Sequence, residues 1–206
     1  MIAHWQKIRD FLVPNMFGRF GIFNVDKAYF AFLEESDSLS VTPKIQLTGI
    51  PKDSILLKVD NVQEGKAKDI TQPLFLVDGK HLRHRCDYIL LTHLEHKDIV
   101  IFFELKSKKI RQCEIVGKFK TSACLLEFIA NVSNSFFGHS ISFSPKPGMI
   151  ECRYVLIFVP DKPTKFSKSR PKPQISHCSA SNFFKYPAIC FGKNKLRVHY
   201  SQLVRI

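Results

Sequence analysis

Two apolar runs near the middle of the chain each contain one acidic residue, and the other predicted elements are arranged around them. The first run, residues 86–91, contains Asp87, and the second, residues 99–105, contains Glu104. The second run is rich in β-branched and aromatic residues and has polar neighbours at both ends, which is typical of a strand buried on both faces. A carboxylate inside such a strand is costly unless it is paired or bound to a metal ion.

The polar residues between the two runs predict a tight hairpin, with its turn centred between Glu95 and His96. Antiparallel pairing then brings Asp87 directly opposite Glu104, with their Cβ atoms about 4.5–5.5 Å apart. Because side chains alternate along a strand, Lys106 projects from the same face as Glu104. Two carboxylates at this separation repel each other unless one is protonated or a cation lies between them, and a hard divalent cation with oxygen ligands resolves the conflict.

An aspartate followed by Glu104-x-Lys106 at the end of an apolar strand resembles the PD-(D/E)xK nuclease superfamily, which has the restriction-endonuclease-like fold. The resemblance implies that Asp87 and Glu104 bind Mg²⁺, with Mn²⁺ as a substitute, and that the backbone carbonyl of Leu105 is a further ligand. It implies that Lys106 orients or deprotonates the attacking water, while the metal acts as Lewis acid and generates the nucleophile. The residue before the aspartate is Cys86, where the family pattern has proline.

Upstream of the hairpin the pattern predicts both helices and strands. The clearest helix has Asp26 as its N-cap. In the resembled fold an early helix packs beside the catalytic sheet and often gives an acid to the metal, so Glu34 and Glu35 are candidate ligands; an exposed last helical turn is the alternative. The predicted segments are a helix at 4–13, an irregular stretch at 15–24, a helix at 26–35, a loop at 43–51, and strands at 54–59 and 73–77.

Downstream of the hairpin, an apolar stripe with three- and four-residue spacing predicts a helix from residue 113 or 114 to residue 131. A strand at 151–159 then returns parallel to the Glu104 strand through a right-handed crossover. Many relatives carry a glutamine in this helix, but Gln112 falls before the predicted start. The remaining predicted segments are loops at 133–147 and 160–173, and a hairpin of residues 188–191 and 195–200 that extends the edge of the sheet.

The chain has 31 Lys and Arg against 18 Asp and Glu, a net charge of +13. This balance favours an anionic partner, with nucleic acid first and an acidic membrane second. No apolar run approaches the roughly 20 residues of a membrane span, and six irregularly spaced cysteines indicate reduced thiols and a cytoplasmic location. Basic residues near the predicted site are candidate nucleic-acid contacts, with a solvated surface as the alternative: Arg83, Arg85, Lys108, Lys109, Lys118 and Lys120.

The 206 residues are therefore predicted to form one α/β domain, residues 1–206, of restriction-endonuclease-like architecture, with a central mixed sheet, an antiparallel catalytic hairpin and a crossover helix. The resemblance implies a Mg²⁺-dependent endonuclease that hydrolyses phosphodiester bonds, with double-stranded DNA as the favoured substrate. It also implies a setting in prokaryotic restriction or anti-phage defence, beside a protein partner that supplies recognition or activation, and it leaves a homodimer open. The alternatives are a catalytically inactive nucleic-acid-binding or assembly module of the same fold, and a protein in which Glu104 and Lys106 form an ordinary ion pair at the strand end and the basic charge serves an acidic protein partner.

Overall fold

The computed structural model of the chain describes residues 20–22, 29–33, 44–52, 54–59, 84–94, 97–106, 111–143, 150–158, 179–187, 189–190 and 196–204. These residues form two five-stranded sheets and two helices, α3 (Gln112–Phe137) and α4 (Ser201–Val204). The first sheet has the order β4 (Ile55–Lys58), β5 (Tyr88–Leu94), β6 (Lys97–Lys106), β7 (Ile150–Phe158) and β8 (Phe184–Pro187). The second has the order β1 (Phe20–Ile22), β2 (Tyr29–Leu33), β3 (Ile45–Ile50), β10 (Leu196–His199) and β9 (Ile189–Cys190). The protein is therefore of mixed α/β class, as predicted, but it has two mixed sheets where one was expected.

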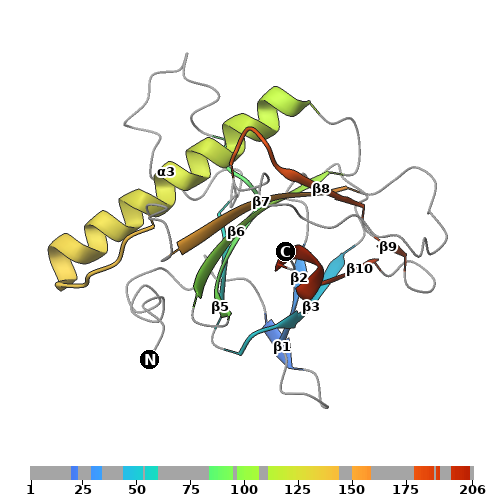
Figure 1. Cartoon of the computed structure of the whole chain (residues 1–206), viewed down its shortest axis with the longest axis horizontal. Coiled ribbons are helices and arrows are strands. Elements are labelled where there is room, and N and C mark those ends of the chain that lie inside the picture. The colour runs from blue at the N-terminus through green and yellow to red at the C-terminus, as the bar shows by residue number, and fades with distance from the viewer. Residues whose placement is uncertain are drawn as a thin grey trace, which may run out of the picture.

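The first sheet lies between two covering layers (Figure 1). On one face α3 crosses the sheet, and Phe119 of the helix shares a core cluster with Phe102 of β6. On the other face the second sheet and α4 share a core cluster with it, which includes Leu47, Phe103 and Leu203. Because successive side chains of a strand point to opposite faces, the unbroken apolar run of β6 supplies both cores.

The pairing of β5 with β6 confirms the predicted hairpin register. Leu94 pairs with Lys97 beside the turn, and the antiparallel ladder continues without a shift to the other end of the hairpin. The last pair of the ladder is Tyr88 with Phe103, and Asp87 and Glu104 are the next residues along the two chains. The local turn therefore determines which residues of the two strands become neighbours.

The predicted helix after the hairpin and the parallel strand that follows it are confirmed. The helix α3 is longer than expected, and it ends at Gly138, whose φ of 64° is the left-handed conformation typical of a helix C-cap. After it, β7 runs parallel to β6. One boundary was wrong, because Gln112 is the first residue of α3 and does not precede the helix. The predicted strand at 54–59 is confirmed as β4.

Residues 29–33, predicted as part of the helix at 26–35, instead form strand β2. Their burial alternates, since Ala31 and Leu33 are buried in the core and Phe32 is exposed. The segment is apolar at every position, so its sequence alone fits either a helix or a strand. Pairing with β3 is what decides between them.

Residues 45–50, predicted as a loop, form strand β3. The register with β2 shifts at Gly49, so that Tyr29 pairs with Ile50 and Phe30 with Thr48. Gly49 has a φ of 72°, a conformation that other residues rarely adopt. This β-bulge interrupts the alternation of apolar and polar side chains, which explains why the strand was missed. The short strand β1 likewise lies in a stretch predicted to be irregular.

The C-terminal hairpin is present, but in a different sheet from the one expected. Strands β9 and β10 pair antiparallel as predicted, yet β10 also pairs parallel with β3 in the second sheet. The edge of the first sheet is β8, which was not predicted. The predicted helix at 4–13, strand at 73–77 and loop at 160–173 lie outside the described residues. Neither described helix combines the length and the apolar character needed to cross a lipid bilayer.

Candidate active site

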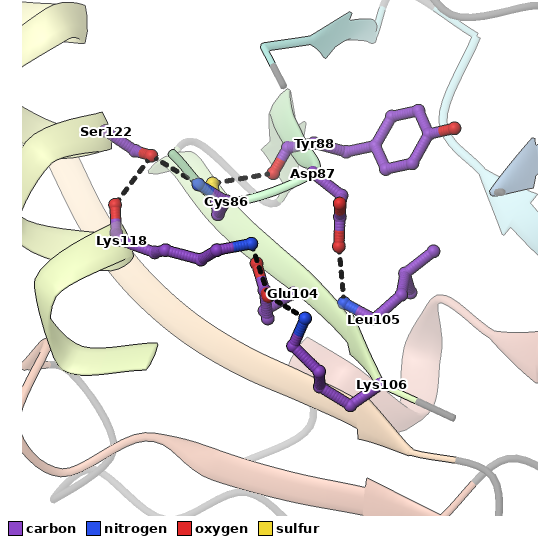
Figure 2. Close-up of polar contacts among 8 residues, drawn as sticks. All are labelled: Cys86, Asp87, Tyr88, Glu104, Leu105, Lys106, Lys118 and Ser122. Carbon is purple, nitrogen blue, oxygen red and sulfur yellow. Dashed lines mark hydrogen bonds and ion pairs between the residues drawn. The ribbon is translucent and has the colours of Figure 1, made fainter. Parts of the chain in front are cut away.

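The two acids singled out by the sequence lie at the open end of the hairpin. Asp87 directly precedes β5, and Glu104 lies near the end of β6. Both are buried, with 2% of Asp87 and 0% of Glu104 exposed. The backbone N–H of Leu105 donates a hydrogen bond of 2.7 Å to Oδ2 of Asp87 (Figure 2). This bond holds the first acid against the strand that carries the second.

Two lysines share one oxygen of Glu104. Oε1 lies 3.1 Å from Nζ of Lys106 and 2.8 Å from Nζ of Lys118. Lys106 is two residues along the same strand, so it shares the face of Glu104 as predicted. The side chain of Lys118 extends from α3 toward Glu104 (Figure 2). The sequence predicted Lys118 as a phosphate contact, and the structure gives it an ion pair with the central acid.

Burial opposes the negative charge on Glu104 more strongly than the lysines support it. Loss of hydration raises the pKa of this carboxyl, and the charges and hydrogen bonds of Lys118 and Lys106 lower it only in part. The net direction is upward from the ordinary pKa of 4.5. A carboxyl in this state gains from any further cation or hydrogen-bond donor that reaches it.

The two carboxylate oxygens of Glu104 differ in their partners. Oε2 is buried and has no hydrogen-bond partner within the part of the chain that the structure describes. An unpaired buried oxygen of a charged group costs about 1–3 kcal/mol or more relative to a satisfied one. Such an atom is an available ligand, and it belongs to the acid that the sequence identified.

Ser122 of α3 connects the helix to the segment that carries Asp87. Oγ of Ser122 accepts a 2.9 Å hydrogen bond from the backbone N–H of Cys86 and donates a 2.8 Å bond to the backbone carbonyl of Lys118 (Figure 2). Cys86 is next to Asp87, so one buried hydroxyl ties the turn that carries Lys118 to the segment that carries the first acid. Sequence reasoning noted Ser122 only within the apolar stripe of the helix, and its polar character there was the available signal.

The thiol of Cys86 is not a nucleophile in this setting. Burial raises its pKa well above the ordinary value, and the nearby carboxyls of Glu104 and Asp87 act in the same direction. The side chain donates a weak hydrogen bond to the carbonyl of Tyr88 at 3.4 Å. Cys86 therefore packs as a small neutral side chain at the position where the resembled pattern has proline.

The oxygen donors of Asp87, Glu104 and the Leu105 backbone are of a kind that fits a hard divalent cation. Glu104 offers Oε2, which has no partner among the described residues, and Asp87 offers carboxylate oxygens on the adjacent segment. The N–H of Leu105 points toward Asp87, and in a strand the carbonyl of the same residue leaves on the same side. All three are oxygen donors of the kind preferred by Mg²⁺ and Mn²⁺. Within the described ranges no group of three or more His, Cys, Asp or Glu side chains is arranged to hold a metal ion, so the donor set consists of two side chains and the backbone.

The other predicted site residues are distributed as follows. Lys120 is exposed on α3, and Arg85 is half-buried just before Cys86. The remaining candidates lie outside the described residues: Glu34, Glu35, Arg83, Lys108 and Lys109.

The described structure thus brings together four side chains at one end of the hairpin: Asp87, Glu104, Lys106 and Lys118. The first three were predicted from the sequence, and the placement of the fourth depends on how α3 packs. Four cysteines in the described part of the chain are free thiols. In comparisons with protein-family models, with curated proteins and with solved structures, nothing matches this chain.

Proposed function

We propose that this protein is a Mg²⁺-dependent endonuclease that hydrolyses phosphodiester bonds of nucleic acid, with double-stranded DNA as the favoured substrate. The observation that carries the proposal is that Asp87 accepts a hydrogen bond from the backbone N–H of Leu105, the residue next to Glu104, while Oε2 of Glu104 is buried and unpaired among the described residues. Lys106 lies beside the same carboxylate. This is the set of groups that the resemblance to PD-(D/E)xK nucleases calls for.

The topology around the site supports the same proposal. An antiparallel hairpin, a helix and a strand parallel to the second hairpin strand follow one another along the chain. The resemblance implied this order, and it also implied that the first turns of the helix lie beside the site. The contact between Lys118 and Glu104 agrees with that expectation.

The residues have distinct tasks in the proposed reaction. Asp87, Glu104 and the Leu105 carbonyl would hold the divalent cation, which supplies Lewis acidity and lowers the pKa of bound water. Lys106 presents an ammonium group next to Glu104, where it orients the attacking water or stabilises charge on the phosphate. The net charge of +13 attracts the phosphate backbone to the protein surface.

The resemblance to PD-(D/E)xK nucleases suggests the biological setting of the proposed activity. Small nucleases that resemble this chain occur in the cytoplasm of prokaryotes, in restriction or anti-phage systems, often with a protein partner that supplies recognition or activation. We include this setting in the proposal. A second copy of the chain or a separate recognition subunit would complete cleavage of both strands.

One observation favours a second candidate function. Lys106 and Lys118 both pair with Glu104, so this acid is already partly neutralised by the chain's own cations. A catalytically inactive module that binds nucleic acid would need nothing more than this. In that case the three residues would stabilise the hairpin and the basic charge would provide the binding.

A cleavage assay distinguishes the two candidates. Purified protein is incubated with plasmid DNA, RNA and single strands in Mg²⁺, in Mn²⁺ and in EDTA, alongside Glu104→Ala and Lys106→Ala. Glu114→Ala and Lys97→Ala are charge-matched controls, because Glu114 is exposed on α3 and Lys97 is exposed at the start of β6. We expect metal-dependent cutting that both site variants abolish and both controls retain. Binding without cutting, unchanged by either site variant, would instead identify the inactive module.

A further inference from the structure

The site contains one cation more than the resemblance requires. Lys106 is the lysine of the E-x-K pattern, but the shorter ion pair to Glu104 is made by Lys118, at 2.8 Å against 3.1 Å. Both ammonium groups contact Oε1. Among the described residues Glu104 therefore has two ammonium groups beside it, and a divalent cation that enters next to Glu104 meets positive charge at contact distance. Like charges this close in a poorly hydrated site repel strongly.

The side chain of Lys118 can move without disturbing the helix that carries it. Packing of α3 against the sheet is provided by its neighbours Ile115 and Phe119, which are buried in the core. The backbone of Lys118 is fixed by the hydrogen bond from Ser122. Its side chain keeps 15% of its surface exposed, so the ammonium end reaches the boundary between the site and solvent. A lysine has a flexible four-carbon stem with a single charge at its tip, which suits exchange between two anionic partners.

We propose that Lys118 is the internal counter-ion of this site: its ammonium group pairs with Glu104 in the metal-free protein and transfers to a phosphate of the nucleic acid when a divalent cation binds. The inference rests on the proposed function. It explains why a buried acid with one unpaired oxygen is stable without metal, and it gives Lys118 both the observed contact and the phosphate contact predicted from the sequence. Metal binding and nucleic-acid binding then assist each other, because each frees the partner that the other needs.

The first test measures metal affinity without nucleic acid. Mn²⁺ is titrated calorimetrically at about pH 8 into the full chain, into Lys118→Met and into Lys97→Met, where the last removes the same charge from an exposed position at the far end of β6. We expect Lys118→Met to bind Mn²⁺ roughly tenfold more tightly, since the ion no longer breaks a charge-assisted hydrogen bond. Lys97→Met should remain near wild type. Lys118→Arg keeps the charge and should also remain near wild type, which covers the case in which the Met variant folds poorly.

The second test follows the salt dependence of binding to a phosphorothioate duplex that resists cleavage. With Mn²⁺ present, Lys118→Met should reduce the slope of log affinity against log salt by about one, the signature of one lost phosphate contact. In EDTA the same variant should leave the slope unchanged, because Lys118 is then held by Glu104. Each variant is thus its own control, and a structural defect would alter both slopes alike.

The outcomes separate this inference from the proposed function. Equal Mn²⁺ affinity in wild type and Lys118→Met, with binding lost in Glu104→Gln, would leave the metal site in place and overturn the role of Lys118. Equal slope changes with Mn²⁺ and with EDTA would also overturn it. If no variant binds Mn²⁺, both proposals fail. Tighter Mn²⁺ binding in Lys118→Met together with a metal-dependent slope change supports the exchange.

Discussion

Replacing Ser122 with alanine tests the connection between α3 and the segment that carries Asp87. The Ser122 hydroxyl accepts the N–H of Cys86 at 2.9 Å, and both residues are fully buried. Alanine leaves this N–H without a partner in a place that water does not reach. The variant isolates one hydrogen bond, because the backbone carbonyl of Lys118, the second partner of Ser122, is also positioned to accept the ordinary helical hydrogen bond.

The expected loss follows from two opposing effects. An unsatisfied buried donor costs about 1–3 kcal/mol. Alanine is a better helix former than serine by up to about 0.5 kcal/mol, which offsets a small part of that cost. A net loss of about 1.5 kcal/mol corresponds to a decrease in Tm of roughly 3–6 °C for a chain of this size.

Thermal unfolding followed by circular dichroism measures this change, and Ser135→Ala is the matched control. Ser135 is exposed on the same helix, so its replacement gains the same helix propensity without removing a buried partner. The control should melt at or slightly above the wild-type temperature. A Tm for Ser122→Ala equal to that of the control would refute the reasoning, because the Cys86 N–H would then be satisfied without the serine.

Two further predictions concern Glu104 and Gly49. Burial raises the pKa of Glu104, so the folded protein binds the proton of this carboxyl more tightly than the unfolded chain does. The stability that Glu104 contributes is therefore full below its ordinary pKa of 4.5. It is lost as the pH rises through the raised pKa of the folded protein. Urea denaturation from about pH 4 to about pH 7 should therefore show wild type losing stability relative to Glu104→Gln, and parallel curves would contradict this sign. At Gly49 the φ is 72°, and a Cβ added there would lie 2.5 Å from Nε2 of His199, so Gly49→Ala should cost at least about 1–2 kcal/mol. The double variant Gly49→Ala/His199→Ala should recover only the steric part in the same assay, and full recovery would show that the backbone conformation costs nothing.

The hairpin of β5 and β6 was predictable because its register is a local property. Leu94 pairs with Lys97, and the ladder then runs in register to Tyr88 and Phe103, so Asp87 and Glu104 are brought to one end of the hairpin through pairs that are close in sequence. The helix α3 was predictable for a similar reason, since its apolar stripe repeats over many turns. The strand parallel to β6 was predictable because a strand that returns to the sheet through a helix usually lies parallel to the strand before that helix.

The contact between Lys118 and Glu104 was not predictable from spacing alone. Helical periodicity places Lys118 one turn before Ser122, at the border of the buried stripe. Whether such a residue turns toward the sheet or toward solvent depends on the rotation of the docked helix. That rotation is set by how Phe119 packs against β6 and β7, and no local pattern encodes it.

The second sheet shows the same division between local and long-range information. The segment Tyr29–Leu33 is apolar throughout and fits a helix as well as a strand, and β3 contains a bulge at Gly49. Both became strands because they pair with each other and because β3 pairs with β10, at the other end of the chain. The amino-acid pattern was thus sufficient for the hairpin, the crossover helix and three residues of the site, where short-range periodicity and turn geometry dominate. Tertiary packing decided the second sheet and the fourth residue of the site, because hydrogen-bond pairing and burial between distant segments outweigh weak local preferences.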